Sequence, residues 1–137
     1  MNENELAKKA VLSLMDLQNQ VTEAALEIQK NIGLGFSIDD YCRAFAYELK
    51  LRDVPFESHK DVELPYKGKI AGNYQLDFLV DNQMILTVLS AEEISNSDKS
   101  KQKSFLKALN LKIGMVINFA NEKVEIKAVY RLSLIHI

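Results

Sequence analysis

The spacing of apolar residues changes once along the chain, near Pro55, and this change limits the fold more than any other feature. Before Pro55, apolar residues recur every three or four positions, as on one face of an amphipathic helix. After Pro55, apolar and polar residues alternate, as in strands with one buried face. The chain therefore combines helices with strands, and its 137 residues are about the length of one domain.

Two helices are predicted before the change. The first covers about residues 3–32, and polar residues 18–20 leave open whether it is one helix or two. Its apolar stripe consists of Leu6, Ala10, Leu14, Leu17, Val21, Ala25, Ile28 and Ile32. The second helix covers residues 37–52, with Ser37 as its N-cap. Its predicted buried line, at spacings of four residues, is Tyr41, Phe45 and Leu49.

Strands dominate the rest of the chain. We expect strands at residues 54–66, 70–80, 84–89, 112–119 and 124–130. A third helix is predicted at 97–109, with Ser97 or Asp98 as its cap. The strand at 84–89 is almost wholly apolar, which predicts that both of its faces are covered. The fold class is therefore a single α/β domain with a mixed sheet flanked by helices, in the order α-α-β-β-β-α-β-β.

Composition and charge exclude several classes of protein. With 47% hydrophobic and 26% charged residues, the chain is typical of globular rather than disordered proteins. Its one cysteine, Cys42, excludes an internal disulfide and a Cys-based zinc site. Residues 1–5 do not resemble a secretory signal and no apolar run could span a bilayer, so we expect a cytoplasmic protein without a membrane partner. The net charge of −2 means that any nucleic-acid binding depends on a local basic patch.

A hairpin of two strands can carry phosphodiester-cleaving chemistry. One acid on the first strand and an acid-x-lysine pair on the second can hold a divalent cation and activate water. Residues 74–80 and 85–89 have this layout. Only the first acid, Asp77, is present.

Residues 24–36 resemble the opening signature of the GxxExxY family, a branch of the PD-(D/E)XK nuclease superfamily. The similarity continues in the same order through Tyr41 and residues 46–49, 66–68, 74–80 and 117–119. It covers about residues 21–131. The resemblance implies an αβββαβ core, which agrees with the order of elements above, and a metal-dependent nuclease ancestry.

The chain departs from the family at the positions that would carry the chemistry. The glutamate of the family's eponymous motif is Ile38, and a histidine late in the first helix is Gln29. The Glu-x-Lys pair is replaced by Thr87-Val88-Leu89. The family's helical glutamine, four residues before Phe105, is Lys101. Because the scaffold positions match, we predict a degenerate catalytic centre.

Asp77 is then a residual catalytic and metal-binding candidate, with backbone donors near its strand end as the structural alternative. Lys101 is either a migrated catalytic lysine or an ordinary surface lysine. Lysines at spacings of four residues predict either a phosphate-binding face or a solvated face. These candidates for nucleic-acid binding are Lys99, Lys103 and Lys107. Cys42 is expected to be a buried thiol, and Glu48 is expected to be structural.

The sequence favours a non-catalytic nuclease-like module that binds nucleic acid or a protein partner. One alternative is an active nuclease rebuilt from Asp77, Lys101 and Glu92 or Glu93, which would need Mg²⁺; otherwise we expect no cofactor. Another alternative is a decaying fragment without function. Residues 1–131 are predicted to form the domain, with 1–20 as a helical extension. Residues 132–137 form an apolar tail that we interpret as foreign sequence rather than a strand extension.

Overall fold

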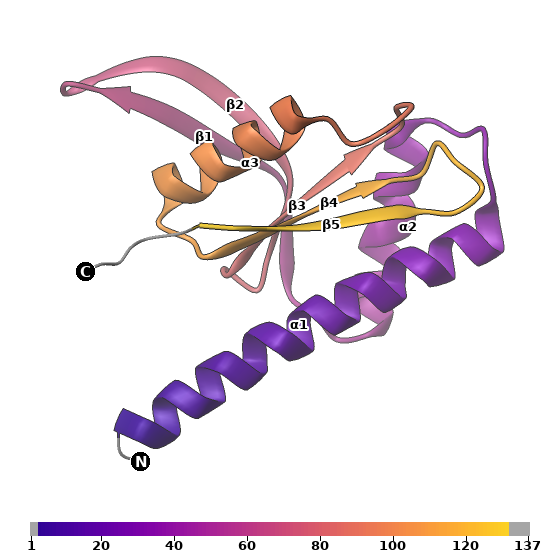
Figure 1. Ribbon diagram of the computed structural model, residues 1–137, viewed down its shortest axis with the longest axis horizontal. Helices are drawn as coiled ribbons and strands as arrows, with labels where there is room; N and C mark the ends of the chain where they lie inside the picture. Colours follow the sequence, from indigo (N-terminus) through magenta and orange to yellow (C-terminus); the bar gives the residue numbers. More distant parts are fainter. Residues whose placement is uncertain (1–2, 132–137) are drawn as a thin grey trace.

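The computed structural model describes residues 3–131, with side chains from residue 13 onward, and confirms the predicted fold class. The tail at 132–137 lies outside the described residues, so the prediction about it stays a prediction. The elements in Figure 1 are α1 (Glu3–Ile32), α2 (Ile38–Leu51), β1 (Phe56–Tyr66), β2 (Lys69–Val80), β3 (Met84–Leu89), α3 (Asn96–Leu109), β4 (Ile113–Asn118) and β5 (Glu125–Tyr130). Within residues 3–131, no helix is long and apolar enough to cross a membrane.

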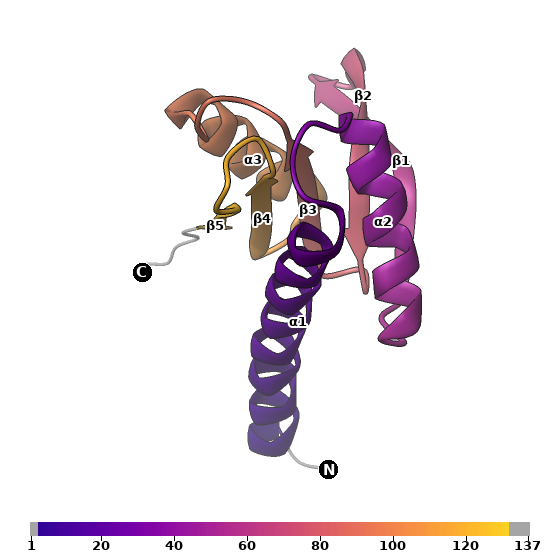
Figure 2. The same cartoon turned by 90° about the vertical axis from the view of Figure 1, so that its right-hand side faces the viewer.

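The five strands form one mixed sheet in the order β1-β2-β3-β4-β5. All neighbours are antiparallel except β3 and β4, which are parallel and are connected through α3. Helices α1 and α2 cover one face of the sheet and α3 covers the other (Figure 2). Met84, Ile85 and Leu86 are fully buried between these layers. This burial explains why β3 is almost wholly apolar.

The hairpin of β1 and β2 projects beyond the rest of the sheet as a long arm (Figure 1). Strand β2 pairs with β3 only through residues 78–80, and its earlier residues pair with β1 alone. Strand β2 leaves β3 at the level of His59 and Asp77, which lie opposite each other between the pairs Ser58–Phe78 and Lys60–Leu76. Neither residue is part of the strand pairing, and His59 has a φ of 54°. Residues 60–76 beyond this point are named the hairpin arm. Leu76 packs on the α3 side of the sheet, whereas Phe78 packs on the α1 and α2 side.

The helices follow their sequence signals closely. Helix α1 is continuous, which answers the question that residues 18–20 left open. Ser37 caps α2 through a capping box with Asp40, as predicted for the cap. Its predicted buried line is confirmed, with Tyr41, Phe45 and Leu49 all in the core.

The predicted cap of α3 was wrong. Ser95 is the N-cap, and its hydroxyl oxygen accepts a hydrogen bond from the Asp98 amide at 3.0 Å. The Asp98 carboxylate accepts one in return from the Ser95 amide at 2.9 Å. Asp98 is therefore the third residue of a capping box rather than the cap itself, and α3 begins at Asn96.

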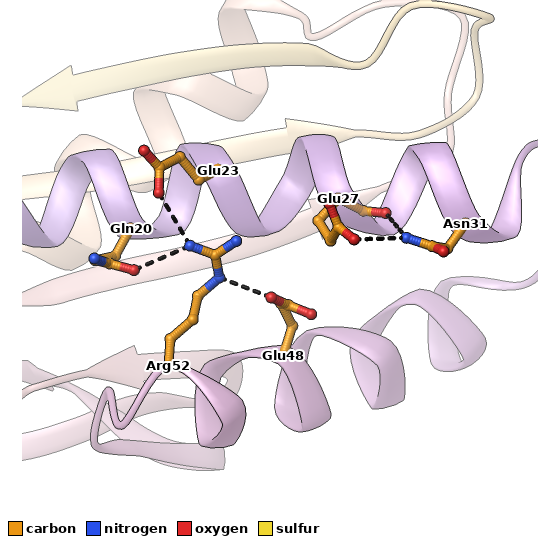
Figure 3. A network of polar contacts seen from close by, with 6 residues as sticks. All are labelled: Gln20, Glu23, Glu27, Asn31, Glu48 and Arg52. Carbon is orange, nitrogen blue, oxygen red and sulfur yellow. Dashed lines mark hydrogen bonds and ion pairs between the residues drawn. The ribbon is translucent and has the colours of Figure 1, made fainter.

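Arg52 links α1 to α2 through polar contacts (Figure 3). Its guanidinium donates to the Glu48 carboxylate at 2.7 Å, to Glu23 at 3.0 Å and to the Gln20 side-chain oxygen at 3.1 Å. Glu48, for which the sequence favoured a structural role, therefore holds the arginine that links the two helices. Gln29 also links elements, because its amide donates to the carbonyls of Asn121 and Glu122 at 3.1 and 2.7 Å.

Candidate functional site

A cleft of about 250 Å³ lies where β2 separates from β3, on the α3 side of the sheet. It brings together one position from α2, one from β2, two from β3 and one from α3. These positions are Ile38, Asp77, Thr87, Leu89 and Lys101. The residual acid and four of the departures from the family pattern therefore share one cleft. Gln29 and the lysines at 99, 103 and 107 are not among the residues that line it.

Two acidic side chains, Asp98 and Asp77, line this cleft. Asp98 belongs to the capping box of α3, and the backbone also uses Asp77. The Asp77 Oδ2 accepts a hydrogen bond from the Val88 amide at 2.8 Å, beyond the last ladder pair of β2 with β3. Burial raises the pKa of the half-buried carboxyl above its ordinary value, and the charge of Asp39 adds to that rise. The Val88 hydrogen bond and nearby His59 offset part of it. The Asp77 side chain thus links β2 to β3 just beyond the point where their backbone pairing ends.

Thr87, for which the resemblance led us to expect a glutamate, forms a hydrogen bond with a buried amide. Its hydroxyl donates to the Gln102 Oε1 at 2.9 Å. The Gln102 Nε2 donates to the carbonyls of Ile85 and Met115 at 3.1 and 3.4 Å, and the residue is only 3% exposed. A Cβ at Gly114 would lie 2.4 Å from that nitrogen, so Gln102 packs directly on β4. The polar groups of this wall therefore satisfy one another.

Sequence reasoning missed Gln102. The resemblance drew attention to position 101, where the family carries a glutamine and this chain carries a lysine. The signal was the helical pattern itself, because Gln102 lies four residues before buried Leu106 and so on the buried side of α3. A polar residue at such a position must find partners inside the protein.

Lys101 also lines the cleft, beside two aromatic rings. Its ammonium is 5.6 Å from the Tyr74 ring centroid and 5.9 Å from that of Phe105. The two rings pack edge to face with centroids 5.4 Å apart. These contacts connect the hairpin arm to α3. The sequence prediction that Lys101 faces the cleft agrees with this geometry, while its proposed catalytic role stays a prediction.

The two carboxylates of the cleft, Asp77 and Asp98, each already accept a backbone hydrogen bond, which leaves a poor site for a catalytic magnesium ion. Such a cation takes about six oxygen ligands, usually with one or two carboxylates from the protein. Within residues 13–131, no group of three or more His, Cys, Asp and Glu side chains is placed to hold a metal ion. Glu92 and Glu93, which the rebuilt-nuclease alternative invoked, are exposed and do not line the cleft.

A second cleft, of about 310 Å³, touches Asp77 from the α2 side of the sheet. It also contains Asp39, Cys42 and His59. Burial raises the pKa of Cys42 to about 12, and the charges of Asp77 and Asp39 contribute. A raised pKa disfavours the nucleophilic thiolate. Cys42 is half-buried rather than buried as the sequence led us to expect.

The lysine stripe of α3 lies on another side of the helix from Lys101. Lys101, Ser104 and Ala108 face the hairpin arm, and Gln102 and Leu106 face the sheet. With 3.6 residues per turn, the stripe falls on the remaining side of the helix, where Lys103 and Lys107 are exposed and Lys99 is half-buried. It consists of Lys99, Lys103 and Lys107. None of the three joins an ion pair within the part of the chain that the structure describes.

Comparison with known proteins places this architecture. The crystal structure of SSO0001 superposes with a TM-score of 0.54 at 12% identity, over 68% of this chain and 50% of that one. The chain thus spans half the length of that protein, and the likeness concerns the fold alone. A search of curated proteins gives no significant match. The family model described as PD-(D/E)XK nuclease superfamily matches residues 15–136, which is most of the sequence. This chain belongs to the PD-(D/E)XK nuclease superfamily.

Proposed function

We propose that this chain is a member of the GxxExxY type whose catalytic centre is degenerate, and that it binds nucleic acid without cutting it. The degenerate centre is argued from the residues that line the cleft where β2 separates from β3, the β2–β3 fork. Its single carboxylate on β2, Asp77, accepts a backbone hydrogen bond, and the two family positions on β3 hold a hydroxyl and an isobutyl group.

Neither β3 side chain can replace the lost chemistry. The Thr87 hydroxyl donates a hydrogen bond to the Gln102 side chain. It carries no negative charge, so it does not replace a carboxylate as a ligand for a cation. Leu89 has no ammonium with which to position water. The Lys101 ammonium comes from α3 and lies over two aromatic rings. Binding without hydrolysis is the activity that this set of groups supports best.

The lysine stripe of α3 supports nucleic acid as the partner. Three ammonium groups at spacings of four residues form a row along one helix face, with no acidic partner in the described residues. Such a row matches the repeated negative charge of a phosphodiester backbone. The net charge of −2 gives no long-range attraction, so affinity depends on this local face.

The test is the salt dependence of binding to a labelled oligonucleotide, measured by fluorescence anisotropy. Three phosphate contacts from the α3 stripe contribute about −2 to −3 to the log–log slope. Replacing Lys99, Lys103 and Lys107 with Gln removes the charges and retains helix propensity. We expect this variant to bind more weakly and its slope to be shallower by about 2 to 3, equally for unrelated sequences, because phosphate contacts carry little sequence information.

A matched control variant removes three exposed lysines from other parts of the surface. Lys30, Lys50 and Lys123 changed to Gln give the same change in net charge. This variant should bind as the unchanged protein does. Absence of binding at low salt, or equal losses in both variants, would contradict the nucleic-acid proposal and direct attention to a protein partner.

A further inference from the structure

Two tyrosines with exposed rings lie on the hairpin arm. Tyr74 is 40% exposed and Tyr66 is 57% exposed. Tyr74 pairs across the hairpin with Val62, and both line the groove beside α3 together with Leu64. Tyr66 lies two residues beyond Leu64, past a shift in the pairing register between Leu64 and Pro65. Val62 and Tyr66 are four residues apart on β1. The backbone positions of the two tyrosines are therefore roughly 13 Å apart along the arm, at about 3.3 Å per residue.

Each of these rings has an ammonium group beside it. The Lys67 Nζ is 5.4 Å from the Tyr66 ring centroid, and the Lys101 Nζ is 5.6 Å from that of Tyr74. Lys69 pairs with Tyr66 across the turn at the tip. The outer arm, residues 64–74, contains two lysines and no acid in a chain whose net charge is −2. The described ion pairs include none of these three lysines.

Aromatic rings alternating with cations are the arrangement that binds unpaired nucleic acid. Bases stack on the rings while lysines contact the phosphates between them. A duplex hides the faces of its bases, so exposed rings favour a single strand over a duplex. The arm has room for such a strand, because its tip projects past the C-terminal end of α3 (Figure 1). A groove of about 130 Å³ with a largely apolar wall also lies between the arm and α3 beside Tyr74.

We infer that the hairpin arm is a base-stacking platform that selects single-stranded nucleic acid. This inference rests on the proposed nucleic-acid binding and adds the class of ligand and a surface separate from the α3 lysine stripe. Tyr66 and Tyr74 stack on unpaired bases, and Lys67, Lys69 and Lys101 neutralise the adjoining phosphates. The cleft at the β2–β3 fork then lies at the base of the platform, since Tyr74 and Lys101 line both the cleft and the groove.

The experiment compares anisotropy titrations of a single strand of about 12 nucleotides with those of the matching duplex. The unchanged protein should bind the single strand more tightly. Changing Tyr66 or Tyr74 to Ala should weaken single-strand binding about 5- to 100-fold per ring and leave the salt slope unchanged. Changing both to Phe should retain the affinity, because Phe keeps the ring. Tyr47→Ala, at a 66% exposed tyrosine on α2, is the matched control and should have no effect.

Tyrosine fluorescence gives a second measurement, because the chain has five tyrosines and no tryptophan. Stacking should quench this emission on single-strand addition, and each of the two Ala variants should show less quenching than the unchanged protein. Equal affinity for single strand and duplex would overturn the inference, as would Ala variants that bind like the unchanged protein. Both results would leave the proposed binding function standing. Absence of binding to either oligonucleotide would remove that function and the inference with it.

Discussion

Removing the Thr87 hydroxyl should destabilise the protein in a way that depends on Gln102. Thr87→Val keeps the side-chain shape but leaves the Gln102 Oε1 without its 2.9 Å donor, in a side chain that is 3% exposed. A buried acceptor left unsatisfied costs about 1–3 kcal/mol of unfolding free energy. When Gln102→Leu has already removed the acceptor, the same change should cost little. The double-mutant cycle should therefore give a coupling energy of about 1–2 kcal/mol.

Urea unfolding followed by circular dichroism measures all four proteins of this cycle. The denaturant slope m should stay constant across them, so that shifts in the midpoint report stability alone. An equal cost of Thr87→Val in both backgrounds would refute the reasoning. It would mean that the Thr87 hydroxyl is available to a ligand rather than engaged in the wall of the cleft.

Three further changes probe the site and the chain end. Asp77→Asn keeps an acceptor oxygen for the Val88 amide but cannot ionise. Because the folded-state pKa of Asp77 is raised, the stability of the unchanged protein falls as pH rises above about 4. Urea unfolding at several pH values should therefore show the variant gaining stability relative to the unchanged protein over that range. Parallel pH profiles would contradict this. Gly114→Ala should lower stability by about 1–3 kcal/mol, because its Cβ meets the buried Gln102 amide, and an unchanged melting temperature would show that the amide moves away freely. Deleting residues 132–137 should leave the melting temperature almost unchanged if the tail is foreign, whereas a loss of a few kcal/mol would indicate a native strand.

The order of elements could be predicted because each boundary carries a local signal. Ser37 caps α2, and the apolar run of β3 indicates a strand covered on both faces. The change in the spacing of apolar residues near Pro55 separates the first two helices from the strands. The cap of α3 was mistaken because Ser95, Ser97 and Asp98 all have cap-forming side chains. Choosing among them requires knowing which side-chain oxygen accepts a hydrogen bond from which backbone amide.

The contents of the cleft could be predicted only in part. The resemblance named Ile38, Thr87, Leu89 and Lys101 as altered positions, but it gave no account of what holds the replacements. The Thr87–Gln102 hydrogen bond joins two elements fifteen residues apart, so no local pattern reports it. The raised pKa of Asp77 likewise depends on burial at the fork and on Asp39 from α2. Such properties appear only when the elements are packed.

The central claim, a superfamily scaffold with a degenerate centre, is tested most directly by assaying DNA and RNA cleavage in Mg²⁺ and Mn²⁺. The account predicts no cleavage above background for the unchanged protein, on single or double strands. As a reference, Ile38→Glu, Thr87→Glu and Leu89→Lys together return the family residues to the cleft that these positions line. Reproducible cleavage by the unchanged protein that disappears in Asp77→Ala would contradict the account.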